Sequence, residues 1–87
     1  MVIEKNVLTI RDKDFRKYYV THFGVHHTKK TVHLDVGNES TILPDKKKAN
    51  VSDCQLIMDF NSFKALIELL NYELGQIEKE FGRIKED

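Results

Sequence analysis

Large apolar residues recur at heptad spacing in the last third of the chain, between Phe60 and Ile84. With Phe60 at heptad position a, every a and d position carries a large apolar side chain, and these residues are called the seam: Phe60, Phe63, Ile67, Leu70, Leu74, Ile77, Phe81 and Ile84. This spacing is typical of an amphipathic helix whose narrow apolar stripe needs a second surface to pack against. We therefore predict one long C-terminal helix over residues 59–87.

A capping residue stands immediately before the seam. The side-chain oxygen of an aspartate can accept a hydrogen bond from a free backbone N–H in the first turn of a helix, and Asp59 occupies that position. Met58 before the cap and Phe63 within the first turns could form a hydrophobic staple. The helix is therefore predicted to begin directly after Asp59.

Strands are predicted throughout the preceding part of the chain. The segments rich in β-branched and aromatic residues are 2–10, 16–27, 31–36 and 51–58. Residues 37–48, which include Pro44, are predicted to form a loop. The expected fold is α+β, a four-stranded antiparallel meander (residues 1–58) followed by one long helix, within a single domain that spans residues 1–87.

The alternation of apolar and polar residues predicts how the two central strands pair. Pairing His27 with Val32 places the apolar residues of both strands on one side of the sheet, whereas a shift by one residue would mix the two sets. The expected apolar face holds Phe23, Val25, Val32, Leu34 and Val36, with Cys54, Leu56 and Met58 from the last strand. The expected polar face holds His22, His26, Thr31, His33 and Asp35.

The length of the predicted helix indicates a homodimer, either intertwined or paired through its helices. A helix from Phe60 to Ile84 would be ~37 Å long, whereas a strand of seven residues spans only ~23 Å. We expect residues 60–72 to cover the sheet and residues 73–84 to pack against a second copy, unless a longer or more curved sheet covers the whole helix. The predicted dimer interface is Phe63, Ile67, Leu70, Leu74, Ile77, Phe81 and Ile84. Whether the helices pair parallel or antiparallel, and whether two or four copies assemble, stays open.

Composition and the first residues of the chain bear on both the class of function and the location of the protein. Fourteen basic and fourteen acidic side chains cancel, so the basic excess of most nucleic-acid-binding proteins is absent. A single cysteine excludes an intramolecular disulfide, which fits a reducing compartment. The first ten residues are too charged for a signal peptide, and no apolar run is long enough to span a membrane. We expect a cytoplasmic protein without membrane contact.

Three short stretches resemble a known family. They are Tyr19 with the strand that follows it, the segment KTVHLDVG (Lys30 to Gly37) and the segment IEKEFGRI (Ile77 to Ile84). Over residues 18–84 the chain resembles the small domain of unknown function DUF3467. That family usually has Ser-Pro at the helix start and Tyr-Glu ahead of Phe-Gly, where this chain has Asp59-Phe60 and Ile77-Glu78. The family has no assigned activity, so the resemblance implies an architecture and no catalytic residue.

Three residues of the expected polar face could bind a metal ion. His26 and His33 would be cross-strand neighbours, and Asp35 lies two residues beyond His33. Two histidines and a carboxylate can bind zinc, nickel or iron. The alternative, which we favour, is a solvated sheet face with no metal, and no cofactor is predicted.

Catalytic chemistry has no comparable pattern. Cys54 lies within an apolar set, where a thiol is usually buried and inert. The serines lack the context of a nucleophile elbow, and four glycines form no phosphate-binding loop. We therefore expect a non-enzymatic protein with no catalytic residue.

Two groups of lysines offer an alternative function. The lysines that could contact phosphates in loops of a dimer are Lys29, Lys30, Lys46, Lys47 and Lys48. Lysines in loops also serve solubility and the protection of sheet edges. The prediction from the sequence is a homodimeric interaction or scaffold module that binds an unknown protein partner, with nucleic-acid binding as the alternative.

Overall fold

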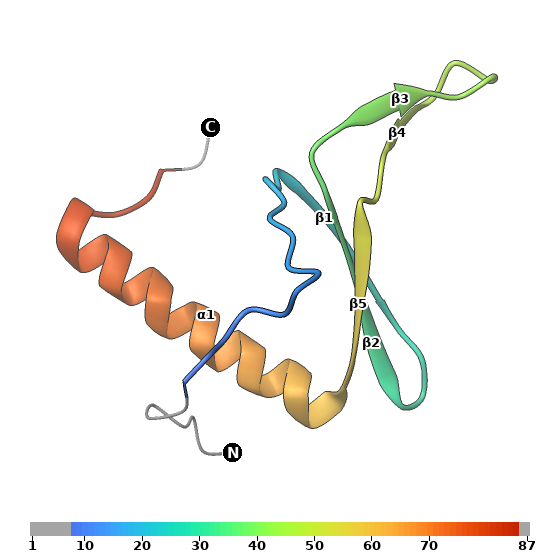
Figure 1. Ribbon diagram of the computed structural model, residues 1–87. Coiled ribbons are helices and arrows are strands. Elements are labelled where there is room, and N and C mark those ends of the chain that lie inside the picture. The colour runs from blue at the N-terminus through green and yellow to red at the C-terminus, as the bar shows by residue number, and fades with distance from the viewer. Residues whose placement is uncertain (1–7, 86–87) are drawn as a thin grey trace.

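The computed structural model describes residues 8–85 and confirms the α+β class, with antiparallel strands followed by one C-terminal helix (Figure 1). The elements in chain order are β1 (His22–His27), β2 (Thr31–Gly37), β3 (Ser40–Ile42), β4 (Lys48–Asn50), β5 (Cys54–Asp59) and α1 (Phe60–Phe81). Strands β1, β2 and β5 form one sheet with β2 in the centre, and β3 and β4 form a separate two-stranded hairpin.

The strand boundaries differ from the predicted ones in the first part of the chain. Most of the predicted strand 2–10 lies outside the described residues, and its described end, residues 8–10, belongs to no strand. The predicted strand 16–27 is shorter and begins at His22. Its partner β2 ends at Gly37, which pairs with His22, so residues 16–21 have no neighbouring strand on which to continue the ladder.

The loop predicted over residues 37–48 contains β3 and the first residue of β4. The turn between these strands has Pro44 at its second position, and the Lys46 N–H donates to the Leu43 carbonyl oxygen at 2.8 Å. Lys46, the last residue of this turn, has a φ of 68°, in the left-handed region. The side chain of Asp45 accepts a hydrogen bond from the Lys47 N–H at 3.1 Å. Three-residue hairpin loops commonly have this form, but glycine usually occupies the left-handed position.

The predicted register of the main sheet is confirmed. His27 pairs with Val32, Val25 with Leu34 and Phe23 with Val36. On the other side of β2, Val36 pairs with Cys54, Leu34 with Leu56 and Val32 with Met58. Because side chains alternate along a strand, these residues share the apolar face, and Gln55 and Ile57 join the polar face.

The helix begins where the sequence predicts. The Asp59 carboxylate accepts a hydrogen bond from the Ser62 N–H at 2.6 Å, which confirms the cap. Hydrogen bonds from Ser62 to this carboxylate lower the pKa of Asp59 below its usual value. The helix ends at Phe81, before the predicted end at residue 87, because Gly82 adopts a φ of 86°, and its N–H donates to the Glu78 carbonyl oxygen at 2.8 Å.

The helix does not cover the sheet, contrary to the expectation for residues 60–72. It diverges from β2 and β5 along its length (Figure 1), and none of its residues is buried. Asp59 is both the last residue of β5 and the N-cap of α1, so no connecting residues allow the helix to fold back. The sheet and the helix therefore form the two arms of an open wedge, with its apex at Asp59.

Candidate self-association surface

The described residues have almost no hydrophobic core. Only two apolar side chains, Val32 and Val36 of the central strand, are buried. The accessible surface is 8414 Å², whereas a compact monomer of 10.2 kDa exposes only ~5,300 Å². The radius of gyration is 16.2 Å, against ~12 Å for a compact chain of this length. The chain therefore leaves a large apolar surface open to contact.

One part of this surface is the apolar face of the sheet. Phe23 is 66% exposed, Val25 62% and Leu56 48%, although all three lie on the face that the strand pattern marks as inward. Cys54 lies on the same face opposite Val36, where its thiol is half-buried. This face needs a covering layer that the described part of the chain does not supply.

The second part is the seam along α1. Phe63 is half-buried, and the remaining seam residues are exposed; Ile84 lies beyond the helix end. Phe81 at the end of the helix is 77% exposed. The structure therefore aligns the predicted interface residues other than Ile84 along one element, without fully burying them within the chain.

The two surfaces meet in a pocket at the apex of the wedge. This apex pocket has a volume of about 410 Å³ and is lined by Val25, His26, His27, Val32, Phe60 and Phe63. Val25 and Val32 belong to the apolar face, and Phe60 and Phe63 begin the seam. The apolar face and the seam are thus one continuous surface.

The polar face carries a pair of stacked histidine rings. The ring centroids of His26 and His33 are 4.8 Å apart, with an angle of 27° between the rings. The His33 ring also forms hydrogen bonds with the Thr31 hydroxyl at 2.9 Å and with the Gln55 side-chain oxygen at 3.4 Å. These bonds engage both nitrogens of His33 and fix the orientation of its ring.

Asp35 is connected to His33 through the side chain of Gln55. Its carboxylate accepts from the Ser52 hydroxyl at 2.8 Å and from the Gln55 amide at 3.3 Å. It pairs with Gly24 in the sheet rather than with either histidine. Between residues 8 and 85, no three or more His, Cys, Asp or Glu side chains are grouped so that they could hold a metal ion.

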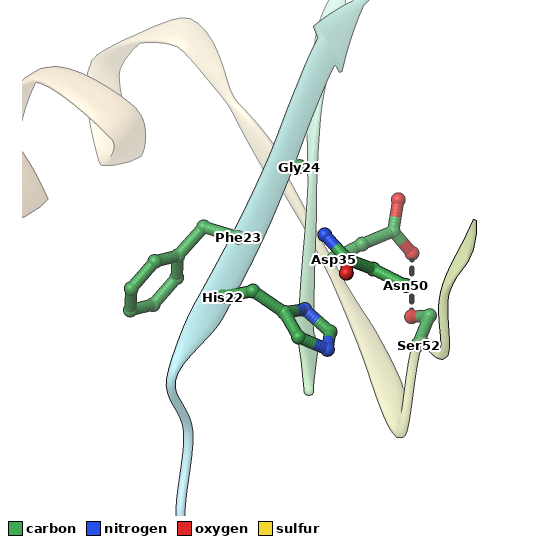
Figure 2. Close-up of a pocket in the computed structure, with 6 residues that line it drawn as sticks. All are labelled: His22, Phe23, Gly24, Asp35, Asn50 and Ser52. Atoms are coloured by element: carbon green, nitrogen blue, oxygen red, sulfur yellow. Dashed lines mark hydrogen bonds between the residues drawn. The ribbon is translucent and has the colours of Figure 1, made fainter. Parts of the chain in front are cut away.

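A second pocket, of about 300 Å³, opens where β1 and β2 meet the chain between β4 and β5. It is lined by His22, Phe23, Gly24, Asp35, Asn50 and Ser52, and Figure 2 shows the bond between Asp35 and Ser52. His22 is held by a 2.8 Å hydrogen bond between its Nε2 and the Glu39 carbonyl oxygen. Sequence reasoning missed Asn50 and Ser52, because their place beside Asp35 depends on the unpredicted β3–β4 hairpin.

The two groups of lysines lie far apart. Lys46, Lys47 and Lys48 are at the end of the β3–β4 hairpin, whereas Lys29 and Lys30 are in the turn between β1 and β2. These turns lie at opposite ends of the molecule (Figure 1). Within one chain the lysines therefore form two separate basic sites rather than one patch.

Comparison of the chain with protein-family models, with curated proteins and with solved structures gave no match. In the part of the chain that the structure describes, no helix is long and apolar enough to cross a membrane.

Proposed function

We propose that this protein is a homodimeric interaction module without catalytic chemistry of its own. The observation that carries the proposal is the exposed apolar surface made by the sheet face, the apex pocket and the seam. The excess over a compact monomer is ~3,000 Å² per chain. Obligate homodimer interfaces bury ~2,000–5,000 Å² in total, that is ~1,000–2,500 Å² per chain, so the excess on each chain is large enough to supply such an interface.

Covering the apolar face leaves the polar face outward. The second pocket and the His26–His33 pair then face solvent on each copy, at positions fixed by the rigid ladder of β1, β2 and β5. Hydrogen-bonding groups held on a sheet are suited to binding a polar segment of another protein. The dimer would act as a scaffold that presents two copies of this face.

The experiment that tests self-association compares two doubly substituted variants by size-exclusion chromatography with light scattering. Leu74→Glu with Ile77→Glu places two carboxylates in the seam. Gly75→Glu with Gln76→Glu adds the same charge at heptad positions b and c, outside the seam. We expect dimers from the unsubstituted protein and the control, and a monomeric or unfolded protein from the seam variant. A monomeric unsubstituted protein, or a seam variant that dimerises normally, would overturn the proposal.

The same chromatography run tests the nucleic-acid alternative. The chain has no tryptophan and only three tyrosines, so it absorbs weakly at 280 nm, and bound nucleic acid would dominate the absorbance at 260 nm. We expect a protein-like ratio of the two absorbances. A high ratio that falls as salt is added would instead assign the lysines of the two turns to phosphate contacts.

A further inference from the structure

We propose that the two copies pair their helices antiparallel, so that Phe81 and Ile84 of each copy cover the apex pocket of the other. This inference rests on the proposed self-association and adds to it the direction and register of the pairing. It identifies the occupant of the apex pocket as the helix end of a second copy.

The seam leads directly into the apex pocket. Phe60 and Phe63 line that pocket together with Val25 and Val32. A helix that packs along the seam of α1 towards Phe60 therefore reaches the apolar face of the sheet. Phe81 of the same chain cannot fill this pocket, because α1 has 22 residues and extends ~33 Å away from it.

The spacing of the seam residues suits an antiparallel pair. Consider two such helices that run antiparallel, with the twofold axis crossing them at the level of residue 72. Each a position then lies opposite a d position of the other copy. Within α1 the layers are Phe63 with Phe81, Ile67 with Ile77, and Leu70 with Leu74. Phe60 lies opposite the segment that follows the helix end of the other copy, which carries Ile84. Phe81 and Ile84 of one copy lie beside the two aromatic residues that line the apex pocket of the other.

The charged residues that flank the seam meet different partners in the two directions of pairing. In an antiparallel pair, e positions lie near e positions of the other helix, and g positions near g positions. Lys64 of each copy then lies near Glu78 of the other, which gives two attractive contacts, and the two copies of Glu73 lie near each other, which gives one repulsive contact. In a parallel pair, g positions lie near e positions of the other helix. That arrangement places Glu73 near Glu78 twice, and Lys85, which would meet Glu80 if the heptads continued, lies beyond the helix end. The balance of charges therefore favours the antiparallel direction.

The two directions of pairing also differ in the apolar surface that they cover. A parallel pair would place both sheets at the same end of the helices, with Phe81 and Ile84 distant from either sheet. An antiparallel pair brings these residues, which are 77% and 52% exposed, towards Phe60 and Phe63 of the other copy. Only the antiparallel direction covers the seam and the apex pocket with the same contact.

Disulfide trapping at Ile67 and Ile77 distinguishes the two directions. In a Cys54→Ser background, the variants are Ile67→Cys, Ile77→Cys and the combination of both. In the antiparallel pair residue 67 faces residue 77 of the other copy, whereas two residues 67 are ~15 Å apart along the axis. Oxidation should therefore trap most of the doubly substituted protein as a covalent dimer and little of either single variant. A Gln76→Cys variant in the same background, outside the seam, serves as the control for random cross-linking.

Light scattering of the same proteins before oxidation separates the two proposals. A dimer whose single variants cross-link efficiently is parallel, which would overturn the antiparallel inference and leave self-association intact. A dimer that forms no covalent link in any of the three seam variants would show that the contact lies outside the seam. That result would also overturn the antiparallel inference and leave self-association intact. A monomeric Cys54→Ser protein would overturn self-association itself.

A spin label at Arg83 provides a second measurement that leaves the seam unchanged. The two labels would be separated by more than ~33 Å along the axis in the antiparallel pair and would lie side by side, ~20 Å apart, in a parallel pair. We expect the longer distance. The shorter distance in a dimeric sample would contradict the antiparallel direction independently of any cysteine in the interface.

Discussion

Gly37 faces His22 across β1 and β2, and this contact leaves no room for a side chain. A Cβ added at position 37 would come within 2.6 Å of His22 Cε1 and closer still to the Val51 carbonyl oxygen. Gly37 is buried at the end of the central strand, where β1 and the connection between β4 and β5 converge. The absence of a Cβ is therefore what allows these three segments to approach.

Substitution of Gly37 by alanine should destabilise the sheet. The Val51 carbonyl belongs to the backbone, so relief of the clash requires movement of the β4–β5 connection, at a cost of about 1–3 kcal/mol. The matched control is Gly24→Ala, whose Cβ would meet Asp35 Cβ at an ordinary 3.8 Å. Chemical denaturation should show a large loss for the first variant and a small change for the second. Equal stability of the two variants would contradict this account.

The Asp59 cap should make helix stability depend on pH. Hydrogen bonds from Ser62 lower the pKa of this carboxyl in the folded state, so its stabilising contribution is complete above the unfolded value of 3.8. The contribution is lost as the pH falls through the lower folded pKa. Asp59→Asn keeps a capping oxygen but cannot titrate, so the difference in Tm between the two proteins should diminish between pH 5 and pH 2. A difference that stays constant over this range would show that the charge contributes nothing.

Gly75 should be replaceable with a gain in stability. It lies in the middle of α1, and a Cβ at this position would meet nothing within 4 Å. Alanine has a higher helix propensity than glycine by about 1 kcal/mol. Gly75→Ala should therefore raise the free energy of unfolding by up to that amount per chain. A loss of stability would indicate that a second copy packs against position 75 and would place the helix contact outside the seam.

The left-handed residue of the β3–β4 turn gives a local test of that hairpin. Lys46 has a φ of 68°, which glycine adopts without strain and β-branched residues tolerate poorly. Lys46→Gly should leave stability unchanged or raise it by up to ~1 kcal/mol, and Lys46→Val should lower it by ~1–2 kcal/mol. Both variants remove the same charge, so the contrast between them isolates the backbone effect. Equal unfolding midpoints would show that residue 46 is not left-handed.

Local patterns predicted the register of the main sheet and the start of the helix. The pairing of His27 with Val32 could be predicted because only one register separates the apolar residues from the polar ones. The N-cap role of Asp59 could be predicted, because an aspartate directly before apolar residues at helical spacing is typical of a helix start. Both inferences need only neighbouring residues.

The hairpin and the direction of the helix depend on backbone angles that the residue types do not reveal. Lysine at position 46 gives no signal of a left-handed turn, so β3 and β4 were missed, and with them the place of Ser52 beside Asp35. The direction of α1 depends on the extended backbone at Asp59, with a ψ of 172°. The expectation that residues 60–72 cover the sheet assumed a connection that bends back. The length and spacing of the seam are the same whether the helix folds back over the sheet or diverges from it, so they could not predict which of the two occurs.

Self-association should make thermal stability depend on protein concentration. If folding and dimerisation occur together, dilution favours the unfolded chains by mass action, and a tenfold dilution should lower Tm by about 4 °C for a dimer of this size. The Gly75→Glu and Gln76→Glu control should show the same dependence. The Leu74→Glu and Ile77→Glu variant, if it stays folded, should have a Tm that does not change with concentration. A concentration-independent Tm for the unsubstituted protein would mean that the exposed apolar face and seam are stable without a second copy.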